Sequence, residues 1–323
     1  MSDSKNLPII IFGAGSIGER HIRNLWFLGY HKLFVFRQRN LPFRDIGDAE
    51  VTVIKTWKEV DEIHPYACII TSPTSLHLSQ AIQSVKMGAH VLIEKPLSSD
   101  TNGFKELVQC VASKNKFAYV GYMMRFHPLL IRIKEIIRGQ QYGHLISLQS
   151  KWGEYLPDWH PWEDYRTSYA AKQELGGGVA LTLSHDIDIA NWLIDSDVKK
   201  FFVQKNYKST LELNVEAGAD LLLKYQNGTT ANIHLNFYEL NKERFLKLVF
   251  EKVSIHLDFY ESSLSIKALD NETKIVLRNY DRNDLFIEQT KYFFSKLNNF
   301  TVSESIQKIK ESETIINICN SGI

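Results

Sequence analysis

The sequence has little cysteine, little net charge and no long hydrophobic run, and each shortage excludes a class of protein. The 323 residues include three cysteines, Cys68, Cys110 and Cys319, which lie far apart. Their odd number and wide spacing predict buried thiols in a reducing compartment. Lysines and arginines number 38 against 37 aspartates and glutamates. No global field therefore draws the chain to nucleic acid or to a membrane surface.

Other familiar signals are also missing. No apolar run approaches the roughly 18 residues of a membrane span. The first residues lead straight into a strand-like run, without the charged leader, apolar stretch and cleavage site of a secretory signal. Neither H-x-x-x-H nor C-x-x-C spacing occurs. We therefore expect a cytoplasmic protein with no metal, membrane or nucleic-acid partner.

What the chain does contain, over residues 1–121, is an alternation of short apolar runs and helical patterns. The strand-like runs are 7–12, 32–36, 51–54, 66–71, 90–93 and 117–121, and the helical patterns are 17–28, 57–63, 76–87 and 101–115. Short buried strands separated by helices predict a parallel, doubly wound α/β sheet. This is the pattern of a Rossmann domain, in which the carboxyl ends of the strands form the ligand-binding edge.

The pattern changes after Tyr122 and becomes rich in strands. The expected strands are 146–152, 201–206, 217–224, 229–236, 245–250, 253–258, 262–267 and 273–277, with helices at 128–138, 283–297 and 301–318. Several strands alternate in polarity, and turn signals such as Asn227-Gly228 separate some of them. We expect residues 122–323 to form an α+β domain on a large, mostly antiparallel open sheet, which binds the substrate and mediates oligomerisation.

A glycine motif, Gly13-Ala14-Gly15-Ser16-Ile17-Gly18, follows the first strand and opens the first helix. In that setting the first glycine makes the tight turn and the second admits a pyrophosphate. The third allows the helix to pack closely on the strand. The amides at the helix N-terminus favour the anion. The alternative is a glycine-rich turn without a ligand.

Arginine stands where a ribose-binding acid is expected. Arg37 follows the second strand, about 20 residues after the glycine motif, where NAD-selective sites carry Asp or Glu. A guanidinium pairs with a 2′-phosphate or stacks on adenine. NADP(H) is therefore favoured, with NAD(H) still possible. The alternative is that Arg37 and Arg39 are solvated charges at a strand end.

A lysine follows the fifth strand, in Glu94-Lys95-Pro96, at the same edge of the predicted sheet. Its ammonium can stabilise an alkoxide or pass a proton beside a nicotinamide. Together with this turn, the sequence resembles the glucose–fructose oxidoreductase / inositol dehydrogenase (Gfo/Idh/MocA) family over nearly its whole length. The motifs that carry the resemblance are 13–18, 71–74 with His77, 94–96, 121–126, 176–178, and His185 with Asp188.

The resemblance implies a Rossmann domain followed by an open-sheet domain, with carbohydrate-like substrates bound where the two meet. It implies that Lys95 and His185 are the catalytic pair. The cofactor-binding residues that it implies are Gly13, Gly15, Ser16, Ile17, Gly18, Arg37, Ser72, Pro73, His77, Glu94 and Lys95. The substrate-binding residues that we expect are Arg125, Trp159, His160, Thr182 and Asp188.

The sequence departs from the family at one point. The family often has an aspartate four residues before the histidine, where this chain has Leu181, and the segment 178–185 is one residue short. Thr182 is the nearest polar substitute. Asp188 lies three residues after His185 and shares a helical face with it, whereas Asp186 is expected to face elsewhere. The departure puts in question a polyol dehydrogenase mechanism that needs the carboxylate.

Residues 152–166 concentrate aromatic and polar side chains. They include three tryptophans, two tyrosines, four acids, a histidine and an arginine. Aromatic faces pack on sugar rings, and Arg166 is suited to a carboxylate or phosphate. The alternative is that Trp159 and Trp162 are core or subunit-contact residues.

Taken together, these features predict an oxidoreductase that transfers hydride to or from a carbohydrate-like substrate with NADP(H). A keto-sugar or sugar nucleotide of surface-glycan biosynthesis is favoured, through the resemblance of residues 152–166. The alternatives are an NAD-dependent polyol or inositol-type dehydrogenase and a non-catalytic NADP(H)-binding sensor or partner protein. We expect a homo-dimer or homo-tetramer formed through the open sheet.

Overall fold

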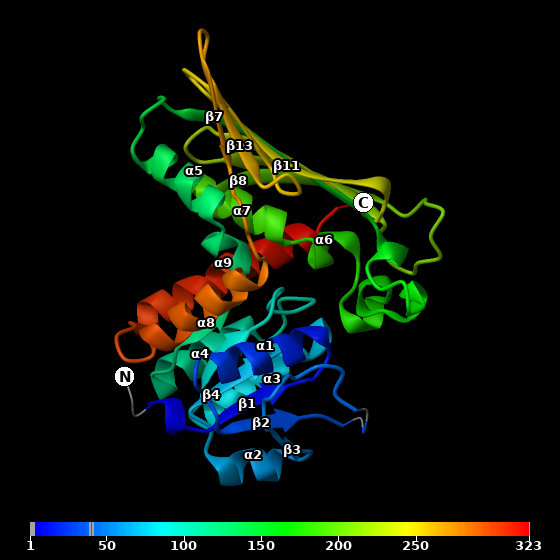
Figure 1. The fold of residues 1–323 in the computed structure, drawn as a ribbon, viewed down its shortest axis with the longest axis vertical. Coiled ribbons are helices and arrows are strands. Elements are labelled where there is room, and N and C mark those ends of the chain that lie inside the picture. The colour runs from blue at the N-terminus through cyan, green and yellow to red at the C-terminus, as the bar shows by residue number, and fades with distance from the viewer. Residues whose placement is uncertain (1–3, 39, 41, 323) are drawn as a thin grey trace. The chain divides into compact units, whose positions relative to one another are not determined.

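The computed structural model describes residues 4–38, 40 and 42–322, so Arg39 lies outside the described residues. The chain forms two compact units. The first contains the residues up to Gly121 together with Phe286–Ile316, and the second contains Tyr122–Leu285 and the residues from Asn317 onward. Each unit has its own sheet (Figure 1).

The first unit is built on a parallel sheet of six strands in the order β3-β2-β1-β4-β5-β6. The strands are β1 (Ile9–Phe12), β2 (Leu33–Phe36), β3 (Thr52–Ile54), β4 (Ala67–Ile70), β5 (His90–Ile93) and β6 (Ala118–Val120). The 3₁₀ helix η1 (Ser4–Asn6) precedes β1, and the helices between the strands are α1 (Ser16–Phe27), α2 (Trp57–Ile63), α3 (Thr74–Lys86) and α4 (Phe104–Lys114). The strand order reverses between β1 and β4, which is where open α/β sheets bind ligands.

The central strands of this sheet are apolar on both faces. Every residue of β1 and of β4 is fully buried, as expected for a parallel sheet covered by helices on both sides. α2 begins with a capping box, in which Glu59 N–H donates to the Thr56 hydroxyl and the Glu59 carboxylate accepts from Thr56 N–H. These local features explain why the sequence pattern predicted the parallel sheet of this unit.

The C-terminal helices α8 (Asn283–Lys296) and α9 (Val302–Asn320) contribute residues 286–316 to the first unit. The Phe293 ring stacks on Phe117 at 5.9 Å between centroids, and Phe294 stacks on Tyr30 at 4.2 Å. The sequence pattern alone predicts that this segment belongs to the second domain, 122–323. The contacts that place it join segments far apart in the chain, so no local pattern marks them.

The second unit is built on an eight-stranded sheet in the order β14-β13-β12-β11-β7-β10-β9-β8. The strands are β7 (Leu145–Tyr155), β8 (Val198–Asn206), β9 (Gly218–Tyr225), β10 (Thr230–Asn236), β11 (Tyr238–Phe250), β12 (Ser254–Asp258), β13 (Ser263–Lys267) and β14 (Glu272–Val276). β7 and β10 pair in parallel and the other neighbours are antiparallel. The predicted fold class, a Rossmann domain followed by a mostly antiparallel open sheet, is confirmed.

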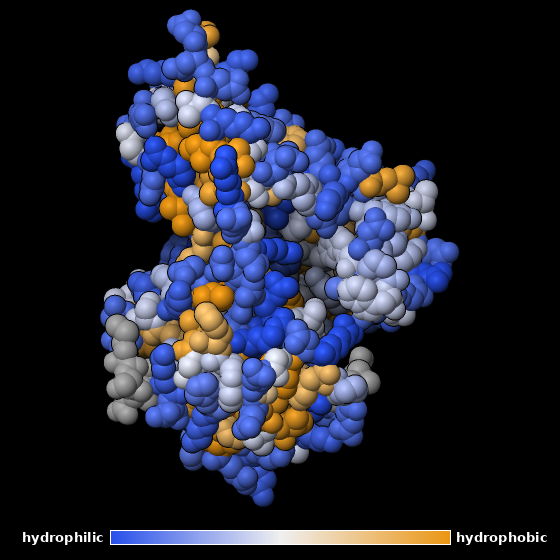
Figure 2. Space-filling view, viewed as in Figure 1, coloured by the Kyte–Doolittle hydropathy of each residue, from blue (hydrophilic) through white to orange (hydrophobic). Residues whose placement is uncertain are grey.

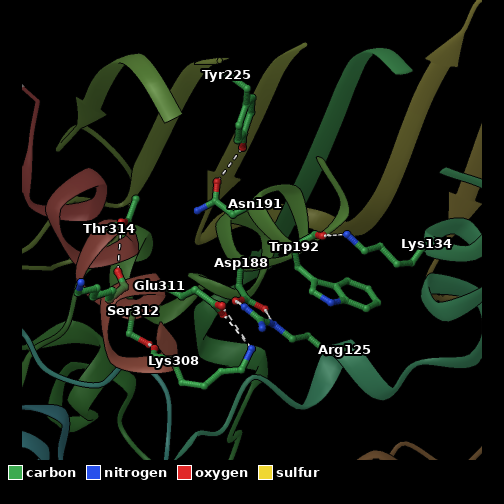
Figure 3. Close-up of polar contacts among 11 residues, drawn as sticks. Arg125, Lys134, Asp188, Asn191, Trp192, Tyr225, Lys308, Glu311, Ser312 and Thr314 are labelled. Atoms are coloured by element: carbon green, nitrogen blue, oxygen red, sulfur yellow. Dashed lines mark hydrogen bonds and ion pairs between the residues drawn. The ribbon is translucent and has the colours of Figure 1, made fainter. Parts of the chain in front are cut away.

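Helices cover one face of this second sheet, as Figure 1 shows for α5 and α7. The helical segments are η2 (Met123–Phe126), α5 (Pro128–Arg138), η3 (Leu156–Asp158), η4 (Tyr165–Thr167), η5 (Tyr169–Ala171), η6 (Gln173–Leu175), α6 (Val179–Thr182) and α7 (His185–Ile194). Tyr225 of β9 donates a hydrogen bond to Asn191 of α7 at 2.7 Å (Figure 3). α7 therefore packs directly on the sheet and forms a second layer over it.

Lys134 of α5 fixes the C-terminal end of α7. Its ammonium, in a residue that is only 4% exposed, donates to the carbonyl of Trp192 at 2.5 Å (Figure 3) and to the Asp195 carboxylate at 2.8 Å. Carbonyls at a helix C-terminus have no partner within the helix. The lysine satisfies them, so α7 is held at the end opposite to His185.

The face of the molecule shown in Figure 2 is mainly hydrophilic, with apolar residues in separate patches. Among the described residues, no helix combines the length and apolarity needed to cross a membrane. The three cysteines are buried and form no disulfide with one another.

Candidate active site

The glycine motif forms a cradle between β1 and α1. A Cβ on Gly18 would lie 2.4 Å from the carbonyl oxygen of Gly13, so only glycine permits this approach of helix to strand. A Cβ on Gly15 would meet nothing within 4 Å, and the N-terminus of α1 has no side-chain cap. Open space beside a helix N-terminus without a side-chain cap fits the pyrophosphate of a dinucleotide.

The end of β2 presents a cation on an aromatic ring. The Arg37 guanidinium lies over Phe43, with Cζ 4.1 Å from the ring centroid, and Arg37 N–H donates to the Ile54 carbonyl at 3.2 Å. Lys55, after β3, donates to Asn40 at 2.8 Å. The aromatic ring holds the guanidinium plane in place at the strand end. This arrangement fits recognition of a 2′-phosphate or of an adenine face.

The loops after β1, β4 and β5 are tied together at the carboxyl edge of the sheet. The Thr71 hydroxyl donates to Phe12 and Gly13 carbonyls at 3.0 and 3.1 Å. The His77 ring bridges two carbonyls, with Nε2 2.7 Å from Ser72 O and Nδ1 2.8 Å from Pro96 O. Burial lowers the pKa of His77, and the two carbonyls oppose that shift. His77 thus joins the loop of Ser72 and Pro73 to the Glu94-Lys95-Pro96 turn.

Glu94 points into the first unit and is hydrogen bonded to a residue that sequence analysis missed. His21 Nε2 of α1 lies 2.8 Å from Glu94 Oε1, and the His21 side chain is fully buried. Burial alone would raise the pKa of Glu94, but the hydrogen bond and charge of His21 and the nearby Lys95 hold it below its usual range. Lys95 N–H donates to Glu94 Oε2 at 3.3 Å. His21 and Glu94 therefore support the turn that presents Lys95.

In the second unit, His185 is the first residue of α7 and is 3% exposed. Its ring lies edge-on to the Tyr122 ring at 5.7 Å and beside the Trp152 indole at 6.4 Å. Burial and the charge of Asp188 raise the pKa of Tyr122 well above its usual value, so the phenol is neutral. A histidine in this setting is suited to proton transfer.

Arg125 and Asp188, both expected to bind substrate, bind each other. Figure 3 shows the guanidinium facing the carboxylate, with Nε 3.0 Å from Oδ2 and Nη2 2.6 Å from Oδ1. The Asp188 side chain is fully buried. The pair ties η2 to the first turn of α7, next to His185.

Asp186, to which sequence analysis gave no role, also has a guanidinium partner. Arg244 Nη2 donates to Oδ2 at 2.6 Å, and the Ser150 hydroxyl donates to Oδ1 at 2.5 Å. Burial raises the pKa of Asp186, and Arg244 and Ser150 oppose the shift by stabilising the carboxylate. No sequence motif marked Ser150 or Arg244. The alternation of polar and apolar residues in their strands is the only local signal.

The glycine turn before α6 packs on a buried glutamate. Gly178 has a φ of +101°, and a Cβ there would lie 2.6 Å from both carboxylate oxygens of Glu216. Glu216 also accepts from Ala180 N–H at 3.2 Å, and burial raises its pKa. Leu181 and Thr182 of α6 are buried. Glu216 therefore brings a carboxylate to the segment that lacks the family aspartate.

The aromatic segment 152–166 spans buried and exposed positions. Trp159 packs edge-on against Phe237 at 5.5 Å, and His160 lies 5.3 Å from the ring of Trp162, which is 71% exposed. Arg166 is paired with Asp164 and Glu212 at 2.9 and 3.0 Å. Trp159 and His160 thus lie between core and solvent.

The structure brings together the expected residues within each unit. The first unit joins the glycine motif, Ser72, His77 and the turn of Lys95 at one sheet edge, and the second gathers Arg125, His185 and Asp188 at the start of α7. Lys95 and His185 belong to different units. Over residues 4–38, 40 and 42–322, no cluster of three His, Cys, Asp or Glu side chains is arranged to hold a metal ion.

Comparison with known proteins gives consistent matches. Residues 7–122 match the model described as "Oxidoreductase family, NAD-binding Rossmann fold", and residues 130–256 match the "GFO/IDH/MocA C-terminal domain". An uncharacterized oxidoreductase, YrbE of Bacillus subtilis, is 26% identical over 251 residues, which cover 71% of this chain and 67% of that protein.

Solved structures share the fold at low sequence identity. A levoglucosan dehydrogenase in complex with NADH superposes with a TM-score of 0.80 at 15% identity and covers 97% of each chain. The UDP-N-acetylglucosamine 3-dehydrogenase of Acidithiobacillus ferrooxidans gives a TM-score of 0.76 at 16% identity and covers 98% of each chain. The two family models together match more than half of the sequence, and the chain belongs to the Gfo/Idh/MocA family of oxidoreductases, with an NAD-binding Rossmann fold.

Proposed function

We propose that this enzyme transfers hydride between NADP(H) and a carbohydrate-like substrate, most suitably a keto-sugar or sugar nucleotide. The observation that carries the cofactor choice is Arg37 stacked on Phe43 at the end of β2, with Cζ 4.1 Å from the ring centroid. No Asp or Glu follows β2 directly, since the next residues are Arg37 and Gln38. A guanidinium attracts a 2′-phosphate, whereas a ribose 2′-hydroxyl is normally held by an acid.

The residues of the first unit would hold the dinucleotide along the sheet edge. The open space at Gly15 receives the pyrophosphate, and the loops of Ser72, Pro73 and His77 line the path to the Lys95 turn. When bound, the nicotinamide cofactor supplies the hydride acceptor or donor. Glu94 accepts a hydrogen bond from Lys95 N–H and is itself hydrogen bonded to His21. These bonds fix the backbone position of Lys95.

Lys95 and His185 are the proposed proton-transfer groups. The Lys95 ammonium stabilises negative charge on the reacting oxygen, and the His185 imidazole takes or returns the hydroxyl proton. The Arg125–Asp188 pair fixes the first turn of α7, which carries His185. Arg125 and Asp188 therefore support His185 in addition to any contact with substrate, and Thr182, which is buried in α6, is proposed as a substrate contact.

The substrate class is inferred from residues 152–166. Trp159 and His160 combine a large aromatic face with a polar edge, which suits the apolar and hydroxylated sides of a sugar ring. The fold of a UDP-N-acetylglucosamine 3-dehydrogenase resembles this one. By its name that enzyme acts on a sugar nucleotide, which shows that this fold accommodates such a substrate; a sugar nucleotide of surface-glycan biosynthesis is proposed here from residues 152–166.

An NAD-dependent polyol dehydrogenase is the second candidate. An inositol 2-dehydrogenase of Rubrobacter xylanophilus is 24% identical over 207 residues, which cover 62% of this chain and 56% of that protein. Leu181 disfavours it, because polyol dehydrogenases of this family often have an aspartate at that position. A substrate panel separates the two candidates.

The open sheet is the proposed oligomer contact. On the face opposite to α7, Phe202 of β8 and Leu222 of β9 are register partners, and they are 53% and 52% exposed. Exposed apolar pairs on a sheet face favour a second subunit. We propose a homo-dimer or homo-tetramer in which this face is buried.

The test is oxidation and reduction of the cofactor with a panel of free polyols, simple sugars and nucleotide-linked keto-sugars. The parent protein, Trp159→Ala and His160→Ala are compared by kcat/KM, with Trp162→Ala as the control for an exposed tryptophan of the same segment. We expect nucleotide-linked or modified sugars to be preferred, and both test variants to lose kcat/KM. The proposal is lost if simple polyols are the best substrates or if both variants match the parent.

A further inference from the structure

Two neighbouring strands of the second sheet place an arginine directly opposite a tryptophan. Arg244 of β11 is the register partner of Trp152 of β7, so the two side chains point to the same face. Ser150, two residues before Trp152, lies on that face as well. α7 packs against β7 on this side of the sheet (Figure 1). Register alone therefore assembles Ser150, Trp152 and Arg244 beneath α7.

The Arg244 guanidinium contacts two aromatic rings. Its Cζ is 3.6 Å from the Trp152 centroid and 4.5 Å from that of Phe259. The edge of the guanidinium reaches Asp186, with Nη2 2.6 Å from Oδ2. The Arg244 side chain is 8% exposed and that of Asp186 is fully buried. Two aromatic rings and one carboxylate thus hold the cation in place.

Asp186 and Trp152 are the two direct neighbours of His185 in this cluster. Asp186 follows His185 in the chain, so holding its carboxylate between Ser150 and Arg244 restrains the first turn of α7. The Trp152 indole lies 6.4 Å from the His185 ring at an interplanar angle of 32°. Arg244 therefore acts on His185 from two sides, through the backbone and through the indole.

Stability alone gives a weak reason for such a pair. Removing two charges from water costs about as much as their attraction returns, and well-packed apolar residues often replace a buried ion pair without loss of stability. The pair lies next to the histidine for which a proton-transfer role is proposed. An ion pair at this place is therefore better explained by orienting His185 than by stabilising the fold.

We propose that Asp186 and Arg244, with Ser150, are positioning residues that hold the imidazole of His185 and the indole of Trp152 in the orientation needed for proton transfer. This inference rests on the proposed function of His185. Loss of the Asp186–Arg244 pair should lower kcat. The pair contacts neither the glycine cradle nor Arg37, because both lie in the first unit. Cofactor affinity is expected to be independent of the pair.

The test variant is the double substitution Asp186→Leu with Arg244→Met. Apolar replacement of both partners is expected to leave the thermal midpoint at or above that of the parent. We expect kcat on the best substrate of the panel to fall roughly 10- to 100-fold, the range for a misplaced reacting group, with an unchanged Kd for NADPH. Arg244→Lys keeps the charge without the planar stack, and it provides a second measurement with an intermediate loss of kcat.

Lys134→Met is the matched control. Lys134 fixes the other end of α7, so this variant lowers the thermal midpoint through the same helix without touching the cluster. We expect its kcat to equal that of the parent. A loss of kcat in Lys134→Met as large as in the double variant would overturn the inference, because any loosening of α7 would then suffice.

A readout independent of turnover separates this inference from the proposed function. The imidazole ¹⁵N resonances of His185, assigned by their absence in His185→Gln, are expected to move in the double variant and to stay in place in Lys134→Met. Unmoved resonances overturn the inference, whatever the turnover. If the resonances move but His185→Ala keeps full turnover, the pair still positions His185, and it is the proton-transfer role of His185 that fails.

Discussion

The guanidinium of Arg125 and the carboxylate of Asp188 hold each other through two hydrogen bonds, one from Nε and one from Nη2. Both groups were expected to bind substrate, and the structure instead makes each the partner of the other. The side chain of Asp188 is fully buried and that of Arg125 is 13% exposed. The pair is therefore a structural element of the site, whatever else either residue contacts.

Breaking this pair on one side should be costly. Arg125→Met leaves the Asp188 carboxylate buried without the guanidinium, and we expect the free energy of unfolding of the second unit to fall by about 3–5 kcal/mol. Urea unfolding followed by circular dichroism measures the change. Arg132→Met, which removes the exposed partner of Glu135 on α5 of the same unit, serves as the control and should change the free energy of unfolding by less than about 0.5 kcal/mol. Equal changes in the free energy of unfolding for the two substitutions would contradict the prediction that the buried pair stabilises the second unit.

Cofactor preference should depend on Arg37. The parent protein is expected to bind NADPH more tightly than NADH. Arg37→Asp removes a charge-assisted partner of the 2′-phosphate and adds repulsion, so NADPH should bind roughly 10- to 100-fold more weakly. Fluorescence titration gives both dissociation constants. Lys32→Asp, an equal change of charge just before the same strand, should leave them unchanged. Equal affinities of the parent for the two cofactors would refute the assignment.

Lys95→Ala and His185→Ala should lower kcat far more than they weaken NADP(H) binding, because their proposed roles begin with the substrate. Loss of one proton-transfer group costs on the order of 10²–10⁴-fold in rate. His185→Ala should also flatten one limb of the pH–rate profile. Steady-state kinetics across pH, with cofactor affinity measured on the same samples, checks both. Near-parental turnover in either variant removes that residue from the mechanism.

His90 should make the first unit sensitive to acid. Burial and the nearby charge of Lys116 lower the pKa of His90 from 6.5 to about 4, and Phe117 N–H donates to His90 Nδ1 at 3.0 Å. The folded state therefore favours the neutral ring. The stability that this shift provides, about 3 kcal/mol, is present above pH 6.5 and is lost as the pH falls to about 4.

The variant His90→Asn keeps an acceptor for Phe117 and removes the titration. We expect its thermal midpoint to depend less steeply on pH between 4 and 6.5 than that of the parent. His64→Asn, at an exposed position of the same unit, should keep the parental slope. An unchanged slope in His90→Asn would assign the acid sensitivity to other groups.

Local patterns predicted most of the fold. β1 and β4 read as uniformly apolar runs because both of their faces are covered, and the glycine motif is interpretable because strand, turn and helix follow one another directly. The contacts within the candidate site could be predicted less well from the sequence. His21 and Glu94 are 73 residues apart, and Arg244 and Asp186 are 58 apart. Sheet register and helix packing determine which distant residues meet. No local pattern in a single sequence indicates these contacts.

The return of residues 286–316 to the first unit has a consequence for how the protein is made. The rings of Phe117 and Tyr30 obtain their partners Phe293 and Phe294 only after residues 122–285, which form most of the second unit, have been synthesised. The amino-terminal sheet thus spends most of synthesis with this apolar surface uncovered. A fragment that ends at Gly121 lacks residues 286–316, so this apolar surface stays exposed to solvent. We therefore expect such a fragment to aggregate and not to behave as an isolated nucleotide-binding domain.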